Sequence, residues 1–350
     1  MSIPHVAIKG IAACVPPQIE EVKEIPFYAE GEADAVIATT GVERKHVVRS
    51  DGITGSDLCL KATEVLLAEL GWERDSVDAI VYVTQTPDYL SPPTVFIMHD
   101  KLNLSNNCMA IDINHGCPGW VIGLNSLVSL MSHGTIKRAL LLDGDNITST
   151  HYALDRESRP LFGDCGTATA LEYNEDAPPM LFEIGTKSKD GKALMHERGG
   201  WRNPYTLETY KRELELRSGL MTMETVTDSM DGMSVFSFGI TMPPKSMKKL
   251  CEEYNIDINE IDKLVLHQAN QFIVNRIAKK MKVDLSKVPI SLKNYGNTTS
   301  ASIPLTIVSQ CADDYKKKQK TLACGFGTGL SWASVYFETE NLICPEVIIY

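Results

Sequence analysis

The chain has 350 residues, with 45 acidic and 34 basic side chains, so its formal net charge at neutral pH is −11. Hydrophobic residues make up 43% of the sequence, which supplies a large core and excludes a disordered or collagen-like chain. An acidic chain without a long basic segment is a poor candidate for nucleic-acid binding, and no apolar run approaches the roughly 20 residues needed to cross a bilayer.

Nine cysteines are scattered along the chain, and none of them forms a C-x-x-C pair. Their odd number and irregular spacing argue against a disulfide framework, and we expect no metal site. Residues 1–8 carry no secretory signal. We therefore expect a cytoplasmic protein with reduced thiols.

Short apolar runs alternate with helical segments along most of the chain. In chain order, strands are expected at 6–11, 79–83, 139–142 and 264–266, and helices at 62–70, 121–131 and 273–281. Alternation of this kind is typical of parallel strands joined by crossover helices. The sequence therefore predicts an α/β fold.

An internal repeat divides the chain. Segments 77–81, 114–117 and 138–141 resemble segments 261–265, 294–297 and 320–323, in the same order and at nearly constant separation. Three collinear matches predict a duplicated structure, with an N-terminal half at 1–175 and a C-terminal half at 176–350. We expect the two halves to pack about a pseudo-twofold axis and to form a cleft at their junction.

Cys117 is the first candidate for chemistry. The apolar strand before it ends at Ile113, Gly116 permits a sharp turn, and Pro118 fits the first position of a helix. Cys117 is thus expected at a helix N-terminus, where the dipole and free N–H groups lower the pKa of a thiol and make it a nucleophile. The alternative is a buried, unreactive cysteine.

Two polar residues of the C-terminal half are the next candidates. His267 follows the strand at 264–266, at the strand end where open α/β sheets place their sites. Asn297 occupies in the repeat the position that Cys117 holds in the N-terminal half, so we expect the two to face one another. The alternatives are a structural histidine and a turn asparagine.

The glycine-rich segment 325–329 resembles a dinucleotide fingerprint only weakly, because no further βαβ unit follows it. A backbone turn whose N–H groups form an oxyanion hole fits better. A cysteine, a histidine and an asparagine at one cleft would suit acyl transfer through a thioester. The thiolate would accept the acyl group, and the two neutral donors would stabilise an enolate oxygen.

The sequence as a whole resembles β-ketoacyl-acyl-carrier-protein synthase III, of the thiolase superfamily. The motifs that carry the resemblance are Thr-Gly-Val-Glu-Arg at 40–44, Gly-Asp-Cys-Gly at 163–166, His-Gln-Ala-Asn at 267–270, Gly-Asn-Thr at 296–298 and the segment 325–332. The resemblance implies a thiolase-like five-layered αβαβα fold, a homodimer, and a catalytic set of Cys117, His267 and Asn297.

The resemblance further implies a decarboxylative Claisen condensation. Cys117 would carry the acyl group, and the backbone N–H groups of Cys117 and Thr328 would form the oxyanion hole. His267 and Asn297 would stabilise the enolate that a malonyl thioester forms as it loses carbon dioxide. Acyl and malonyl thioesters of coenzyme A or of acyl carrier protein would be the substrates, with no cofactor and no metal.

Two departures from the family pattern bear on whether coenzyme A or a carrier protein delivers the substrate. Ala35 and Thr39 match the positions at which family members clasp coenzyme A, and Phe272 replaces an arginine that helps to dock the carrier. A basic helix face is nevertheless expected from Arg276, Lys279 and Lys280. We expect an acidic acyl carrier protein to bind there; the alternative is a solvated helix face.

Three residues are candidates for the acyl pocket. His115 stands two residues before Cys117, where the family has a small residue, and it lines the pocket, perturbs Cys117 or turns away. Ser91 matches a position that often carries an aromatic ring at the pocket end, so a longer or bulkier acyl group is expected. Phe272 is the third candidate.

The segment 187–233, which includes Trp201, Tyr205 and Tyr210, lies where the family caps its substrate. It is the least family-like part of the chain, and we expect it to set specificity.

Two other functions fit parts of the sequence. In one, Cys117 passes its acyl group to an amine or hydroxyl acceptor without decarboxylation. In the other, the chain is a non-catalytic partner subunit of a heterodimeric condensing enzyme.

Overall fold

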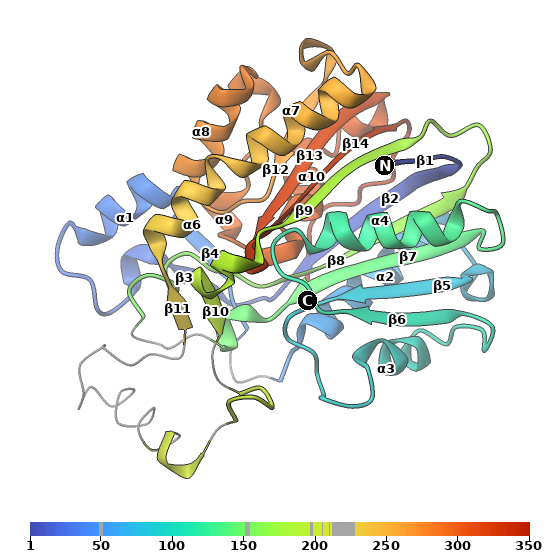
Figure 1. The fold of residues 1–350 in the computed structure, drawn as a ribbon. Coiled ribbons are helices and arrows are strands. Elements are labelled where there is room, and N and C mark those ends of the chain that lie inside the picture. The colour runs from blue at the N-terminus through green and yellow to red at the C-terminus, as the bar shows by residue number, and fades with distance from the viewer. Residues whose placement is uncertain (49–51, 151–154, 197–198, 205, 210, 212–227) are drawn as a thin grey trace.

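Two β-sheets with the same strand order form the framework of the chain (Figure 1). The computed structural model describes residues 1–48, 52–150, 155–196, 199–204, 206–209, 211 and 228–350, with only the backbone of 228–230. The first sheet runs, in spatial order, β15 (Ile348–Ile349), β2 (Val6–Val15), β8 (Cys165–Tyr173), β7 (Arg138–Asp145), β5 (Ala79–Val83) and β6 (Met109–Ile113). The second runs β1 (Ser2–Ile3), β9 (Met180–Thr186), β14 (Ser331–Thr339), β13 (Gln319–Gly327) and β12 (Lys263–Leu266).

The strand order of the first sheet recurs in the second. The order β2-β8-β7-β5 matches β9-β14-β13-β12, as a duplicated structure requires. The two terminal strands cross over, because β1 pairs with β9 and β15 pairs with β2. The division into halves at 1–175 and 176–350 stays a prediction, and the crossing terminal strands would be its exceptions.

The directions of the strands correct one expectation. β5 pairs in parallel with both β6 and β7, and β12 pairs in parallel with β13. The pairs β2–β8, β7–β8, β13–β14 and β9–β14 are antiparallel. The expectation of parallel strands is therefore wrong for these pairs. A short turn at Thr328–Leu330 joins β13 to β14, and a connection of that length can join only antiparallel neighbours.

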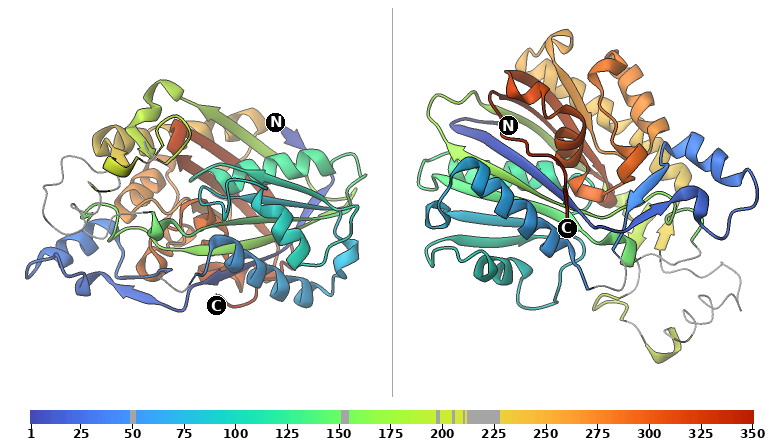
Figure 2. Two further views of the ribbon diagram at one scale, coloured as in Figure 1. Left: turned by 90° about the horizontal axis from the view of Figure 1, so that it is seen from below. Right: turned by 180° about the vertical axis from the view of Figure 1, so that it is seen from behind.

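Helices fill three layers around the two sheets. Between the sheets lie α4 (Gly119–Met131) and α10 (Ser302–Cys311). The first sheet is covered on its outer face by α2 (Gly55–Leu70) and α3 (Thr94–Lys101), and the second by α7 (Met242–Tyr254) and α8 (Gln271–Met281). Figure 2 shows from two further directions that the sheets lie side by side with helices on their outer faces. The layers therefore follow the order αβαβα that the resemblance implies.

The remaining elements lie at the periphery of these layers. They are α1 (Glu32–Thr40), α6 (Gly232–Gly239), α9 (Leu292–Tyr295), the strand pair β3 (Ile19–Glu21) and β4 (Arg44–His46), and the strand pair β10 (Leu194–His196) and β11 (Asp228–Met230).

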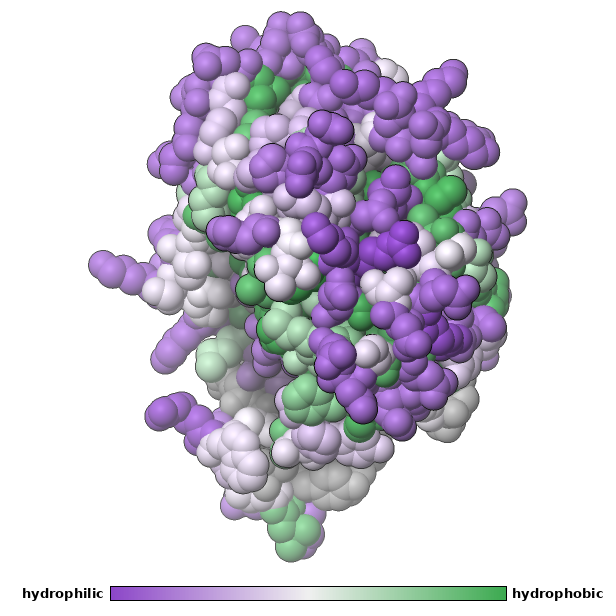
Figure 3. Space-filling view, turned by 90° about the vertical axis from the view of Figure 1, so that its right-hand side faces the viewer, coloured by the Kyte–Doolittle hydropathy of each residue, from purple (hydrophilic) through white to green (hydrophobic). Residues whose placement is uncertain are grey.

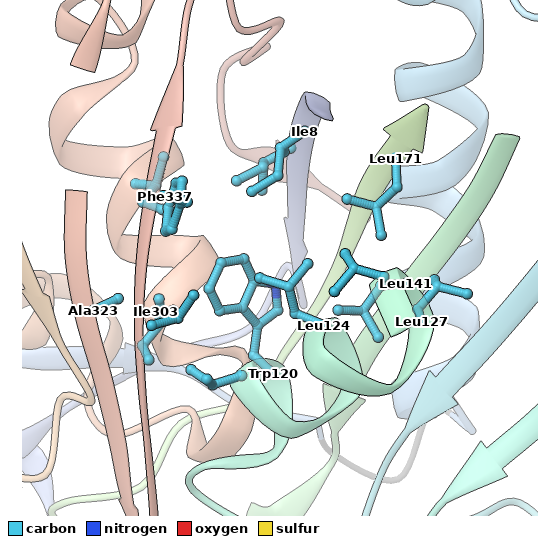
Figure 4. Close-up of a cluster of buried hydrophobic side chains, with 14 of the residues drawn as sticks. Ile8, Trp120, Leu124, Leu127, Leu141, Leu171, Ile303, Ala323 and Phe337 are labelled. Carbon is cyan, nitrogen blue, oxygen red and sulfur yellow. The ribbon is translucent and has the colours of Figure 1, made fainter. Parts of the chain in front are cut away.

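The main core lies in the middle layer, around α4 (Figure 4). Trp120 is fully buried there, and its ring meets that of Phe337 edge to face with 6.2 Å between centroids. Its indole N–H donates to Oγ1 of Thr169 at 3.0 Å, so the one polar atom of the ring is satisfied. These contacts fix the start of α4 against both sheets. Cys117, the first candidate residue, directly precedes this start.

The elements expected from the sequence are confirmed; the strand at 79–83 has the expected bounds, and the others are longer. The strand at 6–11 extends to Val15, the helix at 62–70 begins at Gly55, and the helices at 121–131 and 273–281 each begin two residues earlier. The molecular face on the right of Figure 1 is mostly hydrophilic, with scattered apolar areas (Figure 3). No helix in the described part of the chain is long and apolar enough to span a membrane.

Candidate active site

Cys117 lies between β6 and the first turn of α4, as the sequence predicts. Pro118 is the N-cap of α4, and Gly119 is its first residue. The Cys117 residue is 8% exposed. The end of β13 passes directly against this turn, because a Cβ atom on Gly325 would lie 2.5 Å from Cα of Pro118. The candidate nucleophile is therefore held between the start of α4 and the last residues of β13.

The electrostatic environment of Cys117 differs from the expectation. Burial raises the pKa of Cys117 to about 11, and the negative charge of Asp145 acts in the same direction. Hydrogen bonds from the backbone N–H groups of Thr328 and of Cys117 itself act to lower it. The expected lowering of the thiol pKa is therefore wrong, because desolvation outweighs the N–H donors. At neutral pH the thiol is protonated and must lose its proton as it attacks.

His267 lies directly after β12 and is buried. Its backbone N–H donates to the carbonyl oxygen of Cys324 in β13 at 2.9 Å. Nδ1 lies 2.7 Å from Oγ of Ser302, and the ring meets Phe326 edge to face with 5.4 Å between centroids. Burial lowers the pKa of His267 to about 3, against the smaller effect of a hydrogen bond to the backbone of Thr299. The imidazole is therefore neutral at neutral pH.

Asn297 is buried in the loop before α10, and the first half of the chain holds its backbone. Its N–H donates to the carbonyl oxygen of Leu161 at 2.9 Å, and its carbonyl oxygen accepts from the N–H of Gly163 at 3.1 Å. The side-chain Oδ1 accepts from the N–H of Thr299 at 3.0 Å. Because that bond engages the oxygen, the amide NH₂ is the end of the side chain that can donate to a ligand.

Shared neighbours bring the three candidates together. His267 and Asn297 both hydrogen-bond to the backbone of Thr299. Cys117 receives the N–H of Thr328 at the end of β13, and the His267 ring packs on Phe326 in the same strand. The site therefore lies where α4 begins, between the carboxyl ends of β12 and β13 and the loop before α10. The backbone of Thr328, a predicted oxyanion-hole donor, hydrogen-bonds to Cys117, and its role in the reaction stays a prediction.

Two residues that hold this site together were not predicted from the sequence. Asp145 ends β7, and its Oδ2 accepts a hydrogen bond from Oγ1 of Thr299 at 2.5 Å. The two residues are 154 positions apart, so no local pattern could have indicated the contact. Ser302, the partner of the His267 ring, is likewise 35 positions away from it in the sequence.

The predicted pocket residues lie in three different places. His115 is half-buried beside the start of α4, and its Nδ1 is buried without a hydrogen-bond partner among the described residues. Burial lowers the pKa of His115. Ser91 is exposed, in the loop between β5 and α3. Phe272 is exposed on α8, where its ring packs against Phe236 of α6 with 5.7 Å between centroids.

The predicted docking residues form an exposed face of α8. Arg276, Lys279 and Lys280 all point to the surface, and Lys280 Nζ donates to the carbonyl oxygen of Ile240 at 2.8 Å. In the predicted cap at 187–233, Trp201 is exposed. Tyr205 and Tyr210 lie outside the described residues. Within the described residues, no group of His, Cys, Asp and Glu side chains could hold a metal ion.

The two sheets share one strand order and enclose a middle helix that a cysteine directly precedes, and together they define a thiolase-like fold. The family described as 3-oxoacyl-[acyl-carrier-protein] synthase III matches residues 111–188, and its C-terminal counterpart matches residues 251–339. A crystal structure of 3-oxoacyl-(acyl-carrier protein) synthase from Burkholderia xenovorans LB400 is 34% identical, with a TM-score of 0.91, and the alignment covers 100% of this chain and 98% of that one.

Two further relatives give the same result. 3-oxoacyl-(acyl carrier protein) synthase III from Pseudomonas aeruginosa PAO1 is 26% identical, with a TM-score of 0.83, over 97% of this chain and 100% of that one. The β-ketoacyl-[acyl-carrier-protein] synthase III of Streptococcus pneumoniae is 27% identical over 332 residues, which cover 94% of this chain and 97% of the relative. The chain belongs to the 3-oxoacyl-acyl-carrier-protein synthase III family of acyltransferases.

Proposed function

We propose that the protein catalyses a decarboxylative Claisen condensation between an acyl group held on Cys117 and a malonyl thioester, which gives a β-ketoacyl product. One arrangement supports the proposal. The backbone N–H of Thr328 donates to the sulfur of Cys117, and His267 and Asn297 both hydrogen-bond to the backbone of Thr299 nearby. Family membership supports the same reaction class.

In the first half-reaction, Sγ of Cys117 attacks the carbonyl carbon of an acyl thioester. The bond from that carbon to the donor sulfur breaks, and the donor leaves as a free thiol with the proton that Cys117 loses. The backbone N–H groups of Cys117 and Thr328 already lie at Sγ, so they are the donors for the oxyanion of the tetrahedral intermediate.

In the second half-reaction, the bond between the malonyl carboxylate and its α-carbon breaks, and carbon dioxide leaves. The electron pair forms an enolate, whose oxygen accepts hydrogen bonds from the neutral His267 ring and the Asn297 amide. The α-carbon then attacks the acyl carbonyl, and the Cys117 sulfur leaves and regains a proton. The electron count closes without an oxidant or a reductant, so we propose that the thioester substrates need no cofactor.

Incubation with acyl thioesters and carboxyl-labelled malonyl thioesters, each on coenzyme A and on carrier protein, tests the proposal. The expected result is an acyl mass on Cys117, followed by release of labelled carbon dioxide and a β-ketoacyl product. If the acyl-enzyme forms without release of labelled carbon dioxide and passes its acyl group to an amine or hydroxyl, the reaction is plain acyl transfer and not condensation. A Cys117 that no donor modifies would indicate a non-catalytic partner subunit.

An acyl carrier protein is the proposed macromolecular substrate. Arg276 and Lys279 are exposed on α8, on a chain whose net charge is −11. The Arg276 guanidinium lies over the Phe272 ring, 4.9 Å from its centroid. Phe272 replaces the arginine that family members carry at its position, and this contact keeps the Arg276 charge close to that position. A basic patch of this kind attracts an acidic carrier despite the overall negative charge.

A homodimer is the proposed assembly. Among the described residues β6 is an edge strand, paired only with β5. Apolar side chains are exposed on this strand, on α3 and on the loop before it: Tyr89 (59%), Leu90 (81%), Phe96 (50%) and Ile111 (38%). An uncovered edge strand beside an apolar surface invites association, and a second copy would cover it. Ser91 would then lie near the site of the partner subunit.

Sedimentation of an Ile111→Lys variant tests the assembly. A charge on the edge strand is expected to shift the protein toward monomer. Leu285 is also exposed, at 57%, but lies in the segment after α8, so Leu285→Lys is the control and is expected to stay dimeric. A monomeric wild-type protein would contradict the proposed assembly.

A further inference from the structure

Asp145 links the first sheet to the loop before α10 without belonging to the proposed catalytic set. The residue is buried at the end of β7. Its Oδ1 accepts hydrogen bonds from Oγ1 of Thr84 at 2.8 Å and from the N–H of Gln85 at 2.7 Å. Its Oδ2 accepts the hydroxyl of Thr299 at 2.5 Å. The carboxylate therefore fastens Thr299 to the sheet that carries Cys117.

Thr299 has a strained backbone. Its φ is +51°, in the left-handed region that a β-branched residue rarely adopts. Such a conformation persists only where the surroundings hold it in place, and strain of this kind is concentrated at functional sites. The hydroxyl contact with Asp145 is one of the interactions that hold it.

The strained residue contacts both decarboxylation candidates. Its backbone N–H donates to Oδ1 of Asn297 at 3.0 Å, which turns the amide NH₂ of that side chain away from Thr299. Its backbone also hydrogen-bonds to the His267 ring. A change in the backbone conformation of Thr299 would therefore move both donors at once.

We infer that Asp145 is a positioning residue, which acts through the Thr299 hydroxyl to hold the His267 ring and the Asn297 amide in the geometry that stabilises the enolate. The inference rests on the proposed function and names the group that sets the geometry of its second half-reaction. Among the described residues, the hydrogen-bond partners of the Asp145 carboxylate are Thr84, Gln85, Thr86 and Thr299, so its link to His267 and Asn297 runs through Thr299.

Thr299→Ala and Thr299→Ser test the inference as a matched pair. Both lose the branched methyl group, so they differ only in the hydroxyl oxygen that reaches Asp145. Thr299→Ala is expected to lower the rate of labelled carbon dioxide release about 10- to 100-fold, the range for misplaced catalytic groups. Thr299→Ser is expected to stay near the wild-type rate. Both should load Cys117 at nearly the wild-type rate, measured by intact mass.

Ser300→Ala is the control for a purely structural effect. The Ser300 hydroxyl donates to Asp143, so this variant breaks a neighbouring buried contact between the same loop and the same strand. It is expected to lower the thermal midpoint as Thr299→Ala does, yet to keep the rate of carbon dioxide release near that of the wild type. The loss in Thr299→Ala is expected in kcat for decarboxylation rather than in KM.

Equal carbon dioxide release by Thr299→Ala and Thr299→Ser would overturn the inference, as would a parallel loss of loading and decarboxylation. Asp145→Asn tests the same link from the other side if Thr299→Ala does not fold. It keeps the side-chain size but removes the charge, and an unchanged decarboxylation rate would overturn the inference. A wild-type protein that loads Cys117 but releases no carbon dioxide would overturn the proposed function instead, and this inference with it.

Discussion

A Cβ atom on Gly327 would lie 2.6 Å from Sγ of Cys117 and 2.7 Å from its Cβ. The backbone at the end of β13 therefore touches the candidate nucleophile directly, and only a residue without a side chain leaves the sulfur its place. The same contact buries the thiol and brings the N–H of Thr328 to it. One close approach thus accounts for both the raised thiol pKa and the oxyanion donor.

Gly327→Ala is expected to displace the Cys117 side chain and to abolish formation of the acyl-enzyme. Intact mass after incubation with an acyl thioester measures this directly. A Cβ atom on Gly71, at the end of α2, would strain the backbone but meet nothing within 4 Å, so Gly71→Ala is the control and should load normally. Normal loading of Gly327→Ala would show that Sγ does not react from this position.

The reactivity of Cys117 is expected to rise with pH across the whole physiological range. Because burial raises the pKa of the thiol to about 11, the thiolate fraction grows about tenfold per pH unit below that value. The rate of alkylation at Cys117 by iodoacetamide, followed by peptide mass, measures this fraction. A plateau that begins near pH 7 would mean that the start of α4 lowers the thiol pKa after all.

His267 is expected to make the fold sensitive to acid. Burial lowers its pKa from 6.5 to about 3 in the folded protein, so the unfolded chain binds the proton more readily. The stability that the neutral ring contributes is full above pH 6.5. It is lost as the pH falls from 6.5 toward 3, by about 1.4 kcal/mol per pH unit. In urea unfolding at several pH values, His267→Gln should show a shallower loss over this window, and equal slopes would contradict the prediction.

Charge reversal on α8 is expected to weaken binding of the carrier protein and to leave the catalytic steps unchanged. The double variant Arg276→Glu, Lys279→Glu should raise KM for malonyl-carrier protein by about tenfold at low salt, with KM for the coenzyme A thioester unchanged. High salt should reduce the difference, because it screens exposed charges. Lys317→Glu, on an exposed residue elsewhere, is the control. An equal effect on both malonyl thioesters would argue against docking at α8.

The sequence predicted what local patterns determine. The turn at Gly116 and the periodic helix after it placed Cys117 at the start of α4, and the internal repeat singled out Asn297 as its counterpart. The contact between Asp145 and Thr299 could not be foreseen, because it joins segments that only the fold brings together. The direction of the Cys117 pKa shift was missed for a related reason. Burial by β13, a distant segment, outweighs the local effect of the helix start.

The division of labour among the three proposed catalytic residues is the central claim, and one mass measurement tests it most directly. The wild type, Cys117→Ala, His267→Ala and Asn297→Ala are each given an acyl thioester and then carboxyl-labelled malonyl-carrier protein. We expect the acyl mass in all but Cys117→Ala, and labelled carbon dioxide at the full rate only in the wild type. Loading that collapses equally in all three variants, or carbon dioxide release that survives without His267 and Asn297, would contradict the account.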